Sequence, residues 1–213
     1  MRSRDAGRLD GKKAVITGGG TGIGRGIALA YVEEGCDVVI CGRRADVLAE
    51  TCTAAASLGG GTMSSLLCDQ TDEAAVVSTV KAAAGMLDGR IDILVLNAGS
   101  NITNRSLDKV DAASWRTLID INLNGPFYFV NAVLPLMREG GGGTVINISS
   151  IAGLRALELS GAAYSASKAG LNMIGDQINL EEGKHGIRCT NICPGEVDTP
   201  ILDKRAKPPP AEA

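Results

Sequence analysis

The stretch "TGGGTGIG" (residues 17–24) decides the fold, because it joins the apolar run "KAVIT" (13–17) to a helical stretch from about Gly22 to Glu34. Glycine allows a sharp turn and lets a backbone approach a pyrophosphate with no Cβ in between. The following helix offers free N–H groups and the positive end of its dipole to phosphate. The stretch therefore predicts a dinucleotide site. Its spacing, Gly18-x-x-x-Gly22-x-Gly24, differs from G-x-G-x-x-G, and an ordinary strand-to-helix turn is the alternative.

Outward from this loop, apolar runs alternate with longer helix-like segments. The predicted strands are residues 13–17, 37–41, 64–68, 91–96, 144–149 and 187–192. They read as continuous apolar runs, as expected when both faces of a strand are buried. This alternation predicts an α/β fold, a Rossmann-like doubly wound parallel sheet in three layers with six strands. We interpret residues 1–213 as one dinucleotide-binding and catalytic domain, with residues 1–8 as a disordered lead.

Composition narrows the function classes. The chain has 213 residues, 45% of them apolar, and a formal net charge of -3, which argues against a nucleic-acid partner. No apolar run is long enough for a bilayer, and the first ten residues lack the apolar core of a signal peptide. We therefore expect a cytoplasmic protein that acts on a small molecule.

The six cysteines read as reduced core residues, and no metal site is expected. A redox or metal pair at Cys189 and Cys193 is the alternative. The only histidine, His185, lies in a helix-to-strand turn. This argues against a Ser-His-Asp or Cys-His mechanism unless His185 supplies the base.

Unusual residues follow each predicted strand, at the sheet edge where such folds bind ligands. After the loop they are Arg43 and Arg44, Asp69, Asn97 to Gly99, Ser149 and Ser150, and Pro194 and Gly195. The second strand is followed by Gly42, Arg43 and Arg44, where NAD-binding chains carry a carboxylate for the ribose. These cations favour NADP(H), with NAD(H) possible.

The segment "AYSASKAG" places Tyr164 and Lys168 four residues apart on one helix face. Lowering the pKa of a tyrosine by about 3 units needs roughly 4 kcal/mol. A lysine cation about 4 Å away supplies that much at an effective dielectric of about 20, and an oxidised nicotinamide adds to it. Tyr164 could then exchange a proton with a substrate oxygen that Ser150 holds by hydrogen bonding. Asn122, mid-helix in "DINLNGPF", suggests a special task or a satisfied buried amide.

The motifs "TGGGTGIG", "CDQTD", "LNAG", "INLNG", "SS…YSASK" and "NICPGEVDTP" occur in this order between about Leu9 and Leu202. In this combination the sequence resembles the compact single-domain branch of the short-chain dehydrogenase/reductase family. The resemblance implies catalytic roles for Asn122, Ser150, Tyr164 and Lys168, with a water bound at Asn122 as part of a proton relay. It implies a homotetramer or homodimer formed through the helices that carry Asn122 and Tyr164.

The cofactor-binding residues implied by the loop, the arginines and the resemblance together are Gly18, Thr21, Gly22, Ile23, Gly24, Arg43, Arg44, Asp69, Asn97, Ala98, Gly99, Tyr164, Lys168, Pro194, Gly195, Val197 and Thr199. Leu154, Leu157, Leu159, Ile201 and Leu202 suggest an apolar substrate face, and Arg155 either binds an anionic substrate or is solvated.

Residues 200–213 read as the start of a substrate lid that the family follows with a further helix and a seventh strand. We expect a chain that stops at Ala213 to lack that strand, to be less stable than longer relatives and to be poorly active. The main functional hypothesis is an oxidoreductase acting on a carbonyl or secondary alcohol. The alternatives are a nucleotide-binding protein with impaired catalysis and a redox sensor.

Overall fold

The computed structural model describes residues 7–199. The strands are β1 (Lys13–Thr17), β2 (Asp37–Gly42), β3 (Met63–Leu67), β4 (Ile93–Leu96), β5 (Gly143–Ile148) and β6 (Ile187–Ile192). The α-helices are α1 (Gly22–Glu33), α2 (Ala45–Ala55), α3 (Glu73–Met86), α4 (Ala112–Ile119), α5 (Gly125–Glu139) and α6 (Ala162–Glu182). The described part of the chain therefore has the predicted alternation of strands and helices.

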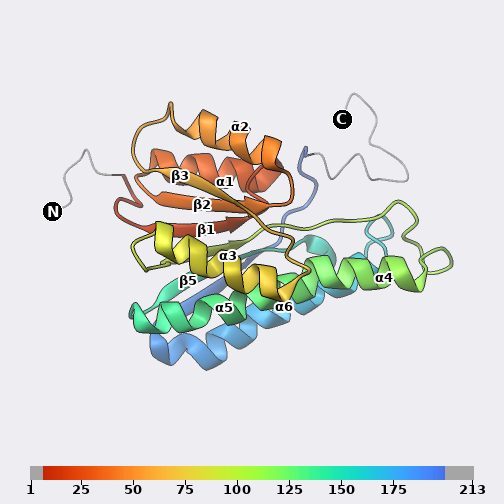
Figure 1. The fold of residues 1–213 in the computed structure, drawn as a ribbon. Coiled ribbons are helices and arrows are strands. Elements are labelled where there is room, and N and C mark those ends of the chain that lie inside the picture. Colours follow the sequence, from red (N-terminus) through yellow and green to blue (C-terminus); the bar gives the residue numbers. More distant parts are fainter. Residues whose placement is uncertain (1–6, 200–213) are drawn as a thin grey trace.

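The six strands form one parallel sheet in the order β3-β2-β1-β4-β5-β6. Helices α1 and α2 cover one face, and α3, α5 and α6 cover the other (Figure 1). Strand order reverses between β1 and β4, and doubly wound folds bind ligands at the carboxyl ends of the strands beside this point. The prediction of a Rossmann-like three-layer fold is confirmed.

Two hydrophobic clusters, one on each face of the sheet, hold the layers together. Along β1, Val15 contributes to the cluster with α3 and α5, whereas Ala14 and Ile16 contribute to the cluster with α1 and α2. This alternation follows from the two-residue period of a strand. The central strands β1 and β4 are buried on both faces, as predicted.

The expectation of strands buried on both faces is wrong at the two edges of the described sheet. β3 carries Ser64 and Ser65 and has no fully buried residue, while β6 alternates between buried and exposed positions. An edge strand has a sheet neighbour on one side only, so fewer side chains cover it.

The segment from Ala112 to Glu139, in which the sequence places Asn122 mid-helix, is three elements. A π-helical segment, Asp120–Asn124, separates α4 from α5. Such segments interrupt the regular i→i−4 hydrogen bonding and often occur at functional sites.

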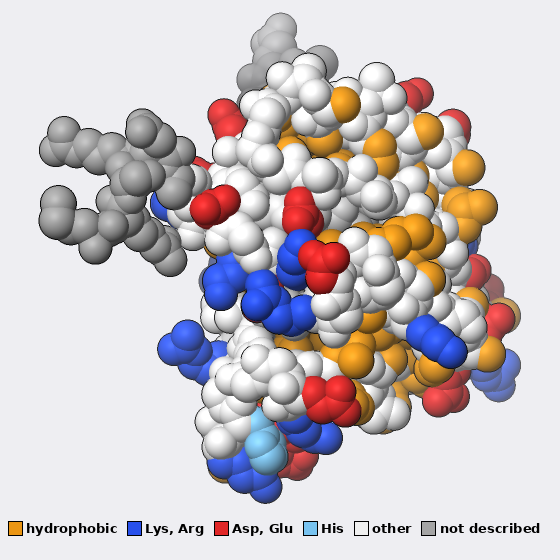
Figure 2. Space-filling model, turned by 60° about the vertical axis from the view of Figure 1, so that its left-hand side comes forward, with side chains coloured by type: hydrophobic (Ala, Val, Ile, Leu, Met, Phe, Trp, Pro, Cys, Tyr) orange, Lys and Arg blue, Asp and Glu red, His pale blue; other side chains and the backbone are white. Residues whose placement is uncertain are grey.

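The amino ends of the strands carry an ionic network. Lys13 Nζ contacts Asp37 Oδ2 at 2.7 Å and Asp88 Oδ2 at 2.8 Å, while Arg90 pairs with Asp92. Figure 2 brings this end of the molecule forward and shows basic side chains beside acidic ones. The contacts join the starts of β1 and β2 to the turn before β4.

Candidate functional site

A cavity of about 1000 Å³ opens at the carboxyl ends of the strands. The predicted site residues that line it are Gly18, Thr21, Gly22, Ile23, Arg43, Arg44, Asp69, Asn97, Ala98, Gly99, Ser150, Tyr164, Lys168, Pro194, Gly195, Val197 and Thr199. Gly24 and Asn122 are the two predicted residues that lie behind its wall. One sheet edge thus brings together residues spread over most of the chain.

The glycine loop needs its glycines for backbone reasons. Gly18 has a φ of +66°, and a Cβ there would lie 2.9 Å from the Cα of Ala98. A Cβ on Gly24 would lie 2.3 Å from Asn97 Nδ2 and 2.4 Å from the Gly18 carbonyl oxygen. Gly24 therefore acts by letting α1 pack against the β4 end, which explains why it does not line the cavity.

The start of α1 fits a pyrophosphate. Thr21, the N-cap residue, makes no side-chain cap hydrogen bond, and the first turn has no acidic residue. Thr21, Gly22 and Ile23 all line the cavity. Helix N-termini present N–H donors and a positive dipole end, which suits a phosphate anion.

Thr17 is a site residue that sequence reasoning missed. Its Oγ1 accepts hydrogen bonds from the backbone N–H groups of Asn97 (3.0 Å) and Ala98 (2.9 Å), and Asn97 Nδ2 donates to the Thr17 carbonyl at 2.9 Å. These bonds join the ends of β1 and β4. The signal available in the sequence was a polar residue closing an apolar strand immediately before the glycine loop.

The ends of β2 and β3 carry the charged part of the cavity. Arg43, Arg44 and Asp69 are exposed and line it. The pKa of Asp69 is lowered mainly by the backbone N–H of Thr71, and to a smaller extent by the charge of Arg43. Gln70, buried beside it and not singled out from the sequence, donates from Nε2 to the carbonyls of Ala98 (3.2 Å) and Ile121 (2.6 Å).

At the opposite end of the cavity, α6 carries Tyr164 and Lys168. Lys168 is 4% exposed, its Nζ donates to the Ile148 carbonyl at 2.8 Å, and it lies 5.8 Å from the centroid of the Tyr164 ring. Ser149 Oγ donates to the Lys168 carbonyl at 3.2 Å. The hydroxyl of Ser150 instead interacts with Tyr164, which makes Ser150 the serine of the pair that faces the tyrosine.

The pKa of Tyr164 differs from the sequence-based expectation, in which the charge of Lys168 lowers it. Burial raises its pKa, and the Ser150 hydroxyl and the Arg105 charge only partly oppose this effect. Lys168 is not among the groups that lower the pKa of Tyr164, and burial lowers the pKa of Lys168 itself to about 8. The Tyr164 hydroxyl is therefore protonated at neutral pH.

Asn122 lies outside the cavity lining and forms hydrogen bonds with the residues around the site. It lies in the π-helical segment and is fully buried. Its Oδ1 accepts from the Ser100 N–H at 2.8 Å, and its Nδ2 donates to the Ser100 carbonyl at 2.9 Å and to Ser167 Oγ at 3.1 Å. The amide thus connects the loop after β4 to α6. The predicted water contact stays a prediction.

A set of buried amides, also missed from the sequence, seats α6 on the sheet. Asn147 Nδ2 donates to Asn191 Oδ1 at 2.8 Å and to the Leu171 carbonyl at 3.1 Å, and Asn191 Nδ2 donates to the Asn172 carbonyl at 3.0 Å. A Cβ on Gly175 would lie 2.3 Å from Asn191 Oδ1, so glycine permits this close approach. Uncharged hydrogen bonds of these amides thus help to hold the helix bearing Tyr164 and Lys168 on the sheet.

The proposed substrate face is divided by the structure. Leu157 and Leu159 line the cavity, whereas Leu154 is exposed and Arg155 does not belong to the lining. Ile201, Leu202 and the expected lid (200–213) lie outside the described residues, as do residues 1–6 of the expected lead. Arg8, from the lead, pairs with Glu34.

The other candidates from the sequence do not line the cavity. Cys189 is buried and Cys193 half-buried, both are free thiols, and burial raises the pKa of Cys189 to about 12. His185 is exposed in a 3₁₀ turn before β6. Within residues 7–199 no cluster of His, Cys, Asp and Glu could hold a metal ion, and no helix is long and apolar enough to cross a membrane.

Comparisons with known proteins agree with this geometry. The model of the short chain dehydrogenase family matches residues 12–209. An uncharacterized oxidoreductase of Staphylococcus saprophyticus is 37% identical over 193 residues, which cover 91% of this chain and 81% of that protein.

Solved structures are similar over the same region. A short-chain type dehydrogenase/reductase from Mycobacterium ulcerans superposes with a TM-score of 0.87 at 32% identity, covering 91% of this chain and 70% of that one. A levodione reductase superposes with a TM-score of 0.88 at 31% identity, covering 92% and 76%.

Proposed function

The chain belongs to the short-chain dehydrogenase/reductase family, and on that premise we propose that it is an NADP(H)-dependent oxidoreductase that interconverts a carbonyl compound and a secondary alcohol. One observation carries the proposal. Ser150, Tyr164 and Lys168 line the same cavity as the glycine loop, so a reacting carbon and a bound nicotinamide would share it.

A nicotinamide nucleotide bound along this edge supplies or accepts the hydride. The protein's part is proton transfer and orientation. Tyr164 is protonated at neutral pH, so its hydroxyl can donate to the oxygen of a carbonyl substrate, and in the reverse direction its oxygen takes the proton back. Ser150, which interacts with the Tyr164 hydroxyl, would hold the substrate oxygen. Lys168, fixed on the Ile148 carbonyl, would place its charge behind the tyrosine and bind the nicotinamide ribose.

The charge at the end of β2 supports NADP(H) over NAD(H). Arg43 and Arg44 line the cavity, and β2 closes on Gly42 without a carboxylate. A 2′-phosphate suits arginine, whose guanidinium binds phosphate through paired N–H groups. The test is the ratio of kcat/KM for NADPH to that for NADH. We expect it to exceed 1 and to fall about 10- to 100-fold in Arg43→Ala, the loss expected for a charged hydrogen bond.

The substrate proposed from the sequence is a small, apolar carbonyl compound or alcohol. Leu157, Leu159 and Ile151 line the reactive end of the cavity. The similar levodione reductase is named for the reduction of a dione, which supports a ketone as the reacting group.

Assembly and location belong to the same proposal. Phe127 on α5 is 49% exposed, and Met173 and Leu180 on α6 are 63% and 79% exposed. Exposed apolar side chains on these helices support the expected homodimer or homotetramer. Size-exclusion chromatography with light scattering measures the mass of the assembly and so tests this expectation. Six free cysteines support a reducing compartment such as the cytoplasm.

The decisive experiment compares the protein with Tyr164→Phe. NADPH oxidation is followed with a panel of ketones, and NADPH binding is followed by fluorescence. We expect Tyr164→Phe to bind NADPH normally and to lose about 10²- to 10⁴-fold in kcat. Equal rates in both proteins, or NADPH binding with no turnover of any ketone, would favour the nucleotide-binding alternative.

A further inference from the structure

We propose that Gln70 is a positioning residue of the reaction, whose amide holds the π-helical segment that carries Asn122 and the loop after β4 in one arrangement. The inference rests on the proposed function and adds to that site a residue for which the sequence predicts no role. Gln70 lies between β3 and α3, next to Asp69 at the nucleotide end of the cavity. It therefore joins that end to the reactive end.

The register of the π-helical segment Asp120–Asn124 gives the carbonyl of Ile121 no main-chain donor. The N–H of Gly125 bonds the Asp120 carbonyl, five residues before it. In the same register the Ile121 carbonyl would take the N–H of residue 126, which is Pro126 and has none. Main-chain carbonyls inside a fold are paired with a donor, so Ile121 needs one from another part of the chain.

Gln70 supplies this donor. Its Nε2 lies 2.6 Å from the carbonyl oxygen of Ile121 and 3.2 Å from that of Ala98, and its side chain is 8% exposed. An amide nitrogen has two N–H donors, so one side chain serves both carbonyls. Because both partners are acceptors, the nitrogen of the amide faces them and not its oxygen. Gln70 thus ties the π-helical segment to the loop after β4.

The main chain around Gln70 is built for this contact. A Cβ on Gly125 would lie 2.7 Å from the Cγ of Gln70 and 2.8 Å from its carbonyl oxygen, so glycine lets the start of α5 approach. Asp69 Oδ1 accepts from the N–H of Thr71 at 3.0 Å and from its hydroxyl at 2.8 Å. The N–H of Asp72 donates to the Asp69 carbonyl at 3.1 Å. A hydrogen-bonded turn therefore presents Gln70 to its two partners.

The two carbonyls that Gln70 holds lie next to residues of the reactive end. Gly99 follows Ala98, and Asn122 follows Ile121. A Cβ on Gly99 would lie 3.3 Å from Asn122 Oδ1 and 3.5 Å from Lys168 Nζ, so both side chains border Gly99. Moving either peptide would change how Asn122 lies relative to Lys168, whose charge the proposed proton transfer uses. One amide outside the catalytic set thus fixes the spacing within it.

The first experiment replaces the amide by a side chain of similar length without donors. We expect Gln70→Met to lower kcat about 10- to 100-fold with NADPH and the ketone that the protein reduces fastest, since a misplacement of about 1 Å can cost this much. KM for NADPH should change little, because the lost contacts are within the protein. The matched control is Gln177→Met, which removes an exposed glutamine of α6 that does not line the cavity, and it should leave kcat unchanged.

Gln70→Glu gives a pH readout that a loss of packing alone would not produce. The new carboxyl would face two carbonyls in a buried place, which raises its pKa above the usual value of about 4.3. Its protonated form donates one hydrogen bond, and its ionised form donates none and repels both oxygens. The ratio of kcat in this variant to kcat in the unchanged protein should therefore rise as pH falls from about 8 to 5. The same ratio for Gln70→Met should stay flat.

Pro126→Ala tests the contact with Ile121 directly, because alanine restores the N–H that the π-helical register lacks. Added to Gln70→Met, it should recover part of kcat. Hydrogen–deuterium exchange of residues 119–126 adds a readout that needs no turnover. Faster exchange in Gln70→Met than in Gln177→Met supports the inference even if no ketone is reduced and the proposed function fails.

Several results would overturn the inference. They are an unchanged kcat or unchanged exchange in Gln70→Met, a flat pH ratio in Gln70→Glu, and a double variant with Pro126→Ala that is no faster than Gln70→Met alone. Gln70→Glu gives both readouts if Gln70→Met does not fold.

Discussion

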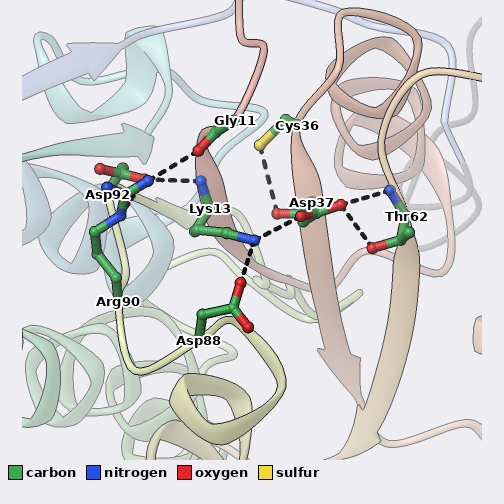
Figure 3. Close-up of polar contacts among 8 residues, drawn as sticks. All are labelled: Gly11, Lys13, Cys36, Asp37, Thr62, Asp88, Arg90 and Asp92. Carbon is green, nitrogen blue, oxygen red and sulfur yellow. Dashed lines mark hydrogen bonds and ion pairs between the residues drawn. The ribbon is translucent and has the colours of Figure 1, made fainter.

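Lys13 and Lys168 occupy opposite ends of the sheet and opposite electrostatic settings. Lys13 opens β1, and its Nζ contacts Asp37 and Asp88, while Asp37 also accepts from the N–H and hydroxyl of Thr62 (Figure 3). Lys168, on α6, donates to the Ile148 carbonyl, and no acidic side chain within residues 7–199 forms an ion pair with it.

The two pKa values move in opposite directions for this reason. The hydrogen bonds to Asp37 and Asp88 raise the pKa of Lys13, whereas burial lowers the pKa of Lys168 to about 8. A compensated charge stabilises the fold near the surface, while a buried charge without a carboxylate is costly. Such perturbed groups are concentrated at functional sites, so the difference itself supports a chemical role for Lys168.

The largest effect that tests this comparison is on activity. We expect Lys168→Met to lower kcat about 10²- to 10⁴-fold, because the charge behind Tyr164 is lost during proton transfer. Lys13→Met should leave kcat unchanged, since Lys13 lies at the amino ends of the strands, away from the cavity at their carboxyl ends. Initial rates at saturating NADPH, with equal helicity in circular dichroism, make the measurement. Similar losses in both variants would mean that the two ends are not separate in function.

Whether the sequence predicts the roles of these lysines depends on how far apart along the chain the contacting residues lie. The glycine loop and the Tyr164–Lys168 pair were predictable because their spacing is local, within one turn or one helix face. The structural role of Lys13 comes from its contacts with Asp37 and Asp88. These residues are 24 and 75 positions away in the sequence, and the order of the strands brings them into contact with Lys13.

The missed parts of the site have the same origin. Asn122, in the π-helical segment, forms hydrogen bonds with Ser100 and Ser167, which no local pattern encodes. Arg105 reads as an ordinary loop residue until the Leu159 carbonyl, 54 residues later, is placed against it. The sheet and the nucleotide edge were therefore predictable, and the contacts between distant loops were not.

The second effect that distinguishes Lys168 from Lys13 is on the free energy of unfolding at alkaline pH. The pKa of Lys168 is lowered from 10.5 to about 8 on folding, so between these values the unfolded chain binds more protons and stability rises with pH. One proton gives up to about 1.4 kcal/mol per pH unit, or on the order of 3 kcal/mol over this window. The difference in unfolding free energy between the unchanged protein and Lys168→Met should change by this amount between pH 8 and 10.5.

Urea unfolding at several pH values measures this difference. Lys13→Met is the control, because the pKa of Lys13 is raised above 10.5 and it does not titrate in the folded state across this window. A parallel pair of curves for the unchanged protein and Lys168→Met would contradict the burial of a charged lysine.

The smallest effect concerns the ionic network at the amino ends of the strands. Lys13→Met should cost about 1 kcal/mol, the value expected of a partly exposed ion pair after solvent screening. The pKa of Asp37 is lowered to about 2, mainly by its hydrogen bond to Lys13, so this contribution is present above pH 4 and is lost as pH falls towards 2. It is also lost in strong alkali, as pH rises through the raised pKa of Lys13.

The loss in Lys13→Met should therefore be constant between about pH 5 and 10 and smaller in 1 M salt, where charges are screened within about 3 Å. Lys12→Met is the matched control, because Lys12 Nζ lies 3.9 Å from Asp92 and its side chain is 49% exposed. If the loss of unfolding free energy in Lys13→Met depended on neither pH nor salt, the methylenes of Lys13, not its charge, would hold the starts of β1 and β2 together. In that case the contrast with Lys168 would be one of packing, and the opposite pKa shifts would be its by-product.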